Sequence, residues 1–182
     1  MKIFLIAGWS GAGKDTAADF LVKEHNFTKF AFADAAKQAT SEEYGFPISW
    51  TKTQEGKKET ITLDTNTTLS VRELIIKYAN TQRENNPYIW AEDVAKKIKN
   101  SNSKNIVISD WRFLDELIGL QRSLPEATLI PLQIVSRGQY VSPIADKTEY
   151  GLLGFPFSLI IENPGDWGFF VNILRILSHL IE

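Results

Sequence analysis

Apolar runs alternate along the chain with stretches of helical spacing, which is the pattern of a parallel sheet covered by helices on both faces. Five short apolar or alternating runs predict strands, at residues 2–7, 27–33, 105–109, 129–135 and 158–162. Apolar residues at helical spacing predict helices over residues 14–24, 34–44, 72–83, 88–99, 113–123 and 167–181. The sequence therefore predicts an α/β fold whose ligands bind beyond the carboxyl ends of the strands.

Three local signals refine this picture. Ser70 and Glu73 have the spacing of a capping box and predict that a helix begins directly after Ser70. Pro131 cannot donate a backbone hydrogen bond, so it favours an edge or irregular position for its strand. The polar residues 47–68 predict a loop or a small hairpin.

Composition narrows the classes of function. The 182 residues are 43% hydrophobic, enough for one substantial core and a single domain. With 20 Lys and Arg against 22 Asp and Glu, the net charge of −2 argues against a nucleic-acid polymer as partner. There is no cysteine, which excludes disulfides and thiolate metal sites. The apolar run at residues 3–7 is too short for a membrane span or a signal peptide, so we expect a cytoplasmic protein, in the host cytoplasm if it is viral.

The strongest chemical signal is a glycine-rich segment between the first strand and the first helix. Its residues Gly8, Ser10, Gly11, Ala12, Gly13, Lys14, Asp15 and Thr16 fit the spacing of a phosphate-binding loop. Glycines let the backbone turn its amides toward phosphate oxygens, and Lys14 adds a point charge at the terminal phosphates. Asp15 stands where Ser or Thr usually faces magnesium, and it could bind Mg²⁺ directly or through water. The alternative is a strand-to-helix turn that binds nothing.

A second constellation, Ser109–Arg112, follows the apolar run at residues 105–109. Asp110 at a strand end is placed for a magnesium site, and Arg112 suits bidentate binding of a second phosphate group. Trp111 between them would touch an acceptor base. The alternative is that Asp110 caps the helix that starts near Phe113.

Further polar residues lie where an acceptor, a lid or a donor base would bind. Arg72 and Arg83, three helical turns apart, could build a cationic acceptor pocket with Lys37, and Asp34 faces the same side unless it is only a helix N-cap. Arg137 opens a loop rich in Gly and Pro, as in a lid that excludes water during phosphoryl transfer. Asn163 and Pro164 form either a platform for the donor purine or a plain turn.

Several of these stretches resemble the bacteriophage-type deoxynucleoside monophosphate kinases of the P-loop nucleotide kinase superfamily. The similar stretches are residues 6–20 (IAGWSGAGKDTAADF), 32–37 (FADAAK), 71–83, 88–91 (YIWA), 106–122 (IVISDWRFLDELIGLQR), 134–139 (IVSRGQ) and 159–165 (LIIENPG). The resemblance implies a three-layer P-loop kinase fold with a central five-stranded parallel sheet and helices on both faces. It also implies an acceptor-binding insert at about residues 34–100 and a short lid at about 137–157.

The same resemblance implies transfer of the γ-phosphoryl group from ATP, with Mg²⁺, to a (deoxy)nucleoside 5′-monophosphate. In this resemblance the loop from Gly11 to Thr16 would hold the donor phosphates. The acceptor would be held by Lys37, Arg72 and Arg112, and Arg137 would act from the lid. Lys14, Arg112 and Arg137 are thus the expected catalytic residues, and Asp15 and Asp110 the expected metal ligands.

Two other functions stay open: a kinase of another small phosphorylated acceptor, and a non-catalytic nucleotide-binding module. Small-molecule nucleotides are the expected partners, with no membrane. The apolar terminal helix with Phe169, Phe170, Ile173, Leu174 and Leu177 either packs on the core or forms a homodimer interface.

Overall fold

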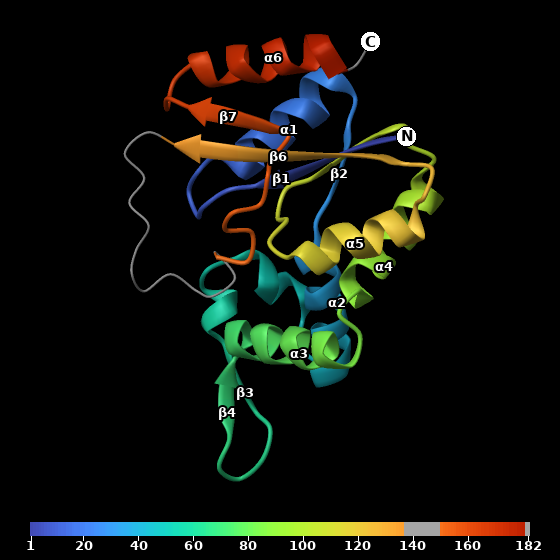
Figure 1. Ribbon diagram of the computed structural model, residues 1–182. Coiled ribbons are helices and arrows are strands. Elements are labelled where there is room, and N and C mark those ends of the chain that lie inside the picture. Colours follow the sequence, from blue (N-terminus) through green and yellow to red (C-terminus); the bar gives the residue numbers. More distant parts are fainter. Residues whose placement is uncertain (137–149, 181–182) are drawn as a thin grey trace.

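The computed structural model describes residues 1–136 and 150–180, with side chains up to Ile176 (Figure 1). Five parallel strands form one sheet in the order β2-β5-β1-β6-β7. Their bounds are β1 Lys2–Ala7, β2 Thr28–Phe30, β5 Asn105–Ile108, β6 Thr128–Ser136 and β7 Leu159–Asn163. The predicted α/β class and the five-stranded parallel sheet are therefore confirmed.

Helices cover both faces of this sheet. They are α1 Lys14–His25, α2 Phe32–Tyr44, α3 Val71–Asn85, α4 Ile89–Ser101, α5 Leu114–Ser123 and α6 Gly168–Leu180. Alternate residues of β1 feed two separate cores: Ile3 and Leu5 pack with α2 to α5, whereas Phe4 and Ile6 pack with α1 and α6. Strand β1 thus packs against both cores, one on each face of the sheet.

Residues 48–70 extend away from the sheet (Figure 1). Two short 3₁₀ helices, η1 Ile48–Lys52 and η2 Gly56–Lys58, precede an antiparallel hairpin of β3 Thr60–Thr62 and β4 Thr68–Ser70. The small hairpin that was one of two expectations is present. Ser70 then caps α3: its Oγ accepts a hydrogen bond from the Glu73 amide at 3.3 Å, and Glu73 Oε2 accepts from the Ser70 amide at 2.8 Å. The predicted capping box is confirmed.

Three expectations about individual elements are corrected. The second strand ends at Phe30 rather than residue 33, because α2 already begins at Phe32. Asp34 therefore lies in the first turn of α2 and is not its N-cap. The strand with Pro131 lies inside the sheet rather than at its edge, but its pairing with β7 begins only at Leu132. Pro131 is thus paired with β1 alone, and no ladder bond to β7 is lost at its missing amide.

The terminal helix α6 packs on the core through one face. Phe169 and Ile173 are buried against α1 and the sheet, while Val171 and Leu174 are 50% and 43% exposed. A homodimer through the outer face stays a prediction. Within residues 1–136 and 150–180, no helix combines the length and the hydropathy that a bilayer span needs.

Candidate functional site: a phosphate-binding loop beside an arginine and two acids

The loop between β1 and α1 has a backbone that only glycine adopts easily. Gly8, Gly11 and Gly13 have φ angles of +146°, +78° and +101°. A Cβ on Gly8 would run into the backbone carbonyl of Ile134, and one on Gly13 would lie 2.5 Å from Asn163 Nδ2. These glycines therefore allow the turn of the loop, and Gly8 and Gly13 also leave room for residues of β6 and β7 that lie against it.

The amino end of α1 has no side-chain cap. Gly13 occupies the N-cap position and has no side chain that could accept a hydrogen bond from the first turn. Lys14 Nζ donates to the carbonyls of Gly8 and Trp9 at 2.8 and 3.0 Å, which holds the ammonium group over the loop. The amino end of a helix together with a lysine suits the binding of phosphate oxygens.

Asp15, the unusual residue of the loop, is held by two neighbours. Its Oδ1 accepts hydrogen bonds from Lys29 Nζ at 2.9 Å and from Ser109 Oγ at 3.0 Å. Burial raises the pKa of Asp15, but these hydrogen bonds outweigh it and hold the pKa below its ordinary value. The carboxylate and the hydroxyls of Thr16 and Ser109 are hard oxygen donors of the kind that Mg²⁺ prefers, so the donor set fits the ion. Within the described part of the chain, no group of three or more His, Asp or Glu residues is arranged so that it could hold a metal ion.

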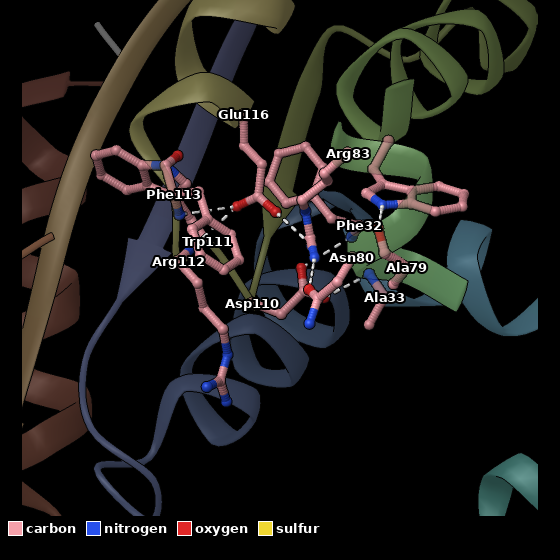
Figure 2. Close-up of polar contacts among 11 residues, drawn as sticks. Phe32, Ala33, Ala79, Asn80, Arg83, Asp110, Trp111, Arg112, Phe113 and Glu116 are labelled. Atoms are coloured by element: carbon pink, nitrogen blue, oxygen red, sulfur yellow. Dashed lines mark hydrogen bonds and ion pairs between the residues drawn. The ribbon is translucent and has the colours of Figure 1, made fainter. Parts of the chain in front are cut away.

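Asp110 caps a helix, although not the one that the sequence suggested. Its two oxygens accept hydrogen bonds from the amides of Phe32 and Ala33 at 2.9 and 2.8 Å, at the start of α2 (Figure 2). Burial raises the pKa of Asp110 above its usual range, and the two amides offset this only in part. The alternative of a cap on α5 is therefore wrong, while a role of Asp110 toward magnesium stays a prediction.

Glu116 in the first turn of α5 joins this site, and no sequence signal assigned it a role. Its side chain is 4% exposed; Oε2 accepts from the amides of Arg112 and Phe113 at 3.0 and 3.1 Å, and Oε1 lies 3.5 Å from Arg83 Nη2. Burial, and next the charge of Asp110, raise the pKa of Glu116 to about 7. Arg83 also donates to Asn80 Oδ1 at 3.2 Å and lies 4.5 Å from the centre of the Phe113 ring.

The arginines predicted to form one acceptor pocket have different surroundings. Arg83 is held against α5, whereas Arg72 is exposed at the other end of α3, about 16 Å away along the axis. Lys37 pairs with Asp34 at 2.7 Å, and both charges act on the pKa of Asp110. The structure thus gathers Asp34, Lys37, Arg83 and Asp110 around the end of β5 and does not add Arg72 to them.

A cavity of about 350 Å³ opens beside the phosphate-binding loop. Its walls come from Gly8 and Trp9, from Trp111 and Arg112, and from residues 152–157. Trp111 is 1% exposed and packs edge-on against Phe155 and Phe157, with ring centroids 5.0 and 5.8 Å apart. Trp111 therefore forms part of an aromatic wall, and a contact of its ring with an acceptor base stays a prediction. The volume is at the lower end of the roughly 300–1,000 Å³ typical of small-molecule sites.

The loop after β7 lies against the phosphate-binding loop. Asn163 Nδ2 donates to the Ala12 carbonyl at 2.9 Å, and its Oδ1 accepts from the Gly165 amide at 2.9 Å. A second cavity of about 380 Å³ extends from Thr16 along Asn163 and Gly165 to Trp167, whose side chain is 81% exposed. Arg137, the predicted lid residue, lies outside the described residues, as does most of the predicted lid.

Sequence reasoning missed Lys29 and Glu116. Lys29 lies on the short strand β2, where a single cation in a strand carries no signal of its own. Glu116 could have been noticed as an acid three residues after Phe113, the N-cap of α5, in the same relation as Glu73 to Ser70.

Comparisons with known proteins identify the fold. No protein-family model and no curated protein sequence matches the chain. Among solved structures, a dephospho-CoA kinase from Campylobacter jejuni is similar with a TM-score of 0.55 at 14% identity, over 99% of this chain and 98% of its own. A sugar kinase from Janibacter sp. HTCC2649 has a TM-score of 0.51 at 14% identity, over 99% and 94%. At this identity the similarity concerns the fold: the chain has the α/β fold of P-loop kinases.

Proposed function

We propose that the protein is an ATP-dependent kinase that transfers the γ-phosphoryl group to a (deoxy)nucleoside 5′-monophosphate. The observation that carries this proposal is the contact between a phosphate-binding loop and an aromatic cavity that contains Arg112. Donor phosphates would bind on the loop, and the acceptor would bind in the cavity with its phosphate at Arg112. The resemblance of the Gly-Lys-Asp-Thr loop and of the Asp-x-Arg segment to phage deoxynucleotide kinases supports the same acceptor class.

The residues have distinct tasks in this mechanism. Lys14 neutralises charge on the transferred group, and the amides of α1 hold the donor oxygens. Asp15 and the neighbouring hydroxyls would hold Mg²⁺, which when bound neutralises the donor phosphates. Arg112 fixes the acceptor in line, and Arg137 would close the site from the lid. An acceptor phosphate is already anionic, so positioning and charge neutralisation suffice without a strong general base.

The donor base would lie in the second cavity, between Asn163–Pro164 and Trp167. An exposed tryptophan at the mouth of an apolar cavity suits stacking on a purine, and Asn163 links that cavity to the loop through its bond to Ala12. Small-molecule nucleotides are therefore the proposed partners, in a cytoplasmic setting, without a nucleic-acid polymer or a membrane.

The test is phosphoryl transfer from ATP and Mg²⁺ to a panel of nucleoside and deoxynucleoside monophosphates, with separation of the products. A diphosphate formed from one or a few acceptors supports the proposal and names the base. Bound ATP without any diphosphate would overturn it in favour of another acceptor or of a non-catalytic nucleotide-binding module.

A second candidate acceptor is a hydroxyl group on a small molecule. Asp34 favours it, because its side chain is 67% exposed, lies in the first turn of α2 near Asp110 and is held by Lys37, as a general base would be. An Asp34→Asn variant separates the two functions: transfer to a hydroxyl would fall by about 100-fold or more, whereas transfer to a phosphate would change little.

A further inference from the structure

Glu116 connects three separate parts of the candidate acceptor site. It lies on α5, accepts hydrogen bonds from the backbone of residues 112 and 113, and faces Arg83 on α3 across 33 residues of sequence. Figure 2 shows its carboxylate between these groups, with Arg83 directed toward the two acids and the guanidinium of Arg112 directed away from them. One buried side chain thus contacts both arginines, each in a different way.

Helix capping explains only half of this arrangement. Oε2 accepts the amides of Arg112 and Phe113, which a neutral glutamine oxygen could do equally well. Capping gives no reason to bury a negative charge beside a second one, Asp110, since desolvation and repulsion both oppose that. The carboxylate of Glu116 forms an ion pair with Arg83, whose guanidinium also contacts Asn80 and the Phe113 ring.

The consequence concerns Arg112. Because its amide is tied to Glu116, the backbone of residues 112–113 has one orientation relative to α5, and Arg83 ties the same point to α3. Arg112 lines the 350 Å³ cavity, so this orientation sets where its guanidinium meets a ligand. Asp110 contributes from the other side by fixing the start of α2.

We propose that Glu116 is a positioning residue for acceptor binding, which orients Arg112 through its backbone and locks α3 to α5 through Arg83. The acceptor part of this proposal rests on the proposed kinase function. The orientation of the two arginines does not, so it can be tested in the ligand-free protein.

The first experiment uses Glu116→Gln, which keeps the shape and the backbone acceptor but removes the charge. Glu73→Gln is the matched control, because Glu73 has the same capping position on α3 and is exposed. In steady-state kinetics at a pH above 7, where Glu116 is ionised, Glu116→Gln should raise the KM for the acceptor by about tenfold, change kcat by less than about threefold and leave the affinity for ATP unchanged. Glu73→Gln should leave all three values within about twofold of wild type. An unchanged acceptor KM in Glu116→Gln, or the same change in both variants, would overturn the proposal.

A second variant keeps the proposal testable if Glu116→Gln does not fold. Arg83→Met should raise the acceptor KM in the same way, and the double variant should be no worse than either single one, because both changes break the same link. Strictly additive effects would contradict a shared role.

NMR of the arginine side chains separates this proposal from the proposed function. In ligand-free protein, the Nε–H signal of Arg83 should shift in Glu116→Gln, which breaks the ion pair. The Nε–H signal of Arg112 should shift in Glu116→Ala, which also removes the backbone acceptor. Both signals should stay in place in Glu73→Gln. Unchanged signals overturn the positioning role even if the wild type is an active kinase. Shifted signals in a protein that phosphorylates no acceptor would uphold the positioning role and refute the kinase function.

Discussion

At the scale of single residues, the candidate site depends on charges whose surroundings differ more than their sequence positions suggest. Lys14 lies over the loop carbonyls, Asp15 is neutralised by Lys29, and Glu116 is buried beside Asp110. Each of these groups responds differently to a change of charge, so each can be tested alone.

Lys14→Ala removes the ammonium group that lies over the loop and that would bind the donor phosphates in the proposed mechanism. We expect turnover to fall by about 100-fold or more, the usual cost of losing an electrostatic group that acts in the transition state. Lys23→Ala is the control, because Lys23 lies on the same helix with its side chain 83% exposed. Full turnover in Lys14→Ala would refute the proposed mechanism.

Glu116 predicts an unusual dependence of stability on pH. Its pKa of about 7 in the folded protein exceeds the ordinary value of 4.5, so between these values the folded state holds a proton that the unfolded chain releases. The stability of the wild type should therefore fall as pH rises from 4.5 to 8. Relative to Glu116→Gln, the fall should be about 3 kcal/mol, at about 1.36 kcal/mol per pKa unit.

Urea denaturation of both proteins at a series of pH values measures this difference. Glu73→Gln serves as a control of opposite sign, because hydrogen bonds from Ser70 lower the pKa of Glu73. There the wild type should gain stability over the variant as pH rises through the acid range. A constant difference between wild type and Glu116→Gln would show that Glu116 titrates normally.

At the scale of elements, the helices at this site differ in whether a neighbouring or a distant residue caps their first turn. Helix α3 is capped locally by Ser70 and Glu73, and the sequence predicts that start correctly. Helix α2 begins at Phe32 because Asp110, 78 residues away, accepts its first amides. The capping box of α3 is visible in a short stretch of sequence, whereas the contact of Asp110 with α2 is not. For this reason the predicted boundary between β2 and α2 was wrong.

Asp110→Ala tests this long-range cap. Loss of two amide acceptors at the start of α2 should lower the free energy of unfolding by about 1–2 kcal/mol. Asp34→Ala, in the first turn of the same helix, removes only an exposed pair with Lys37 and should cost less than about 0.5 kcal/mol. Equal losses in denaturant melts would mean that the amides of Phe32 and Ala33 do not depend on Asp110.

At the scale of the whole molecule, the order of the strands brings together segments that are far apart in the sequence. Because β5, β1, β6 and β7 are parallel neighbours, the loops that follow these strands lie at the same edge of the sheet. The phosphate-binding loop and the strands next to it were predictable, since spacing and apolar runs are local. The link from Glu116 to Arg83 and the hold of Lys29 on Asp15 were not, because each arises only when the sheet is assembled.

A donor nucleotide bound across this edge should stabilise the entire fold. A non-hydrolysable ATP analogue with Mg²⁺ at 100 times its Kd should add about 2.7 kcal/mol, which for a domain of this size raises Tm by about 5–10 °C. In Asp15→Asn the additional rise in Tm caused by Mg²⁺ should disappear, whereas the rise caused by the nucleotide alone should persist. The variant removes a proposed ligand of the ion but leaves the backbone amides of the loop in place.

Asp19→Asn is the matched control, since it removes the other carboxylate bound by Lys29 and leaves Asp15 in place. It should keep the Mg²⁺ increment in thermal denaturation. A persistent increment in Asp15→Asn would exclude Asp15 as a metal ligand and direct attention to Asp110. If the nucleotide shifts Tm in none of these proteins, the loop does not bind a triphosphate, and the kinase function fails together with the nucleotide-binding alternative.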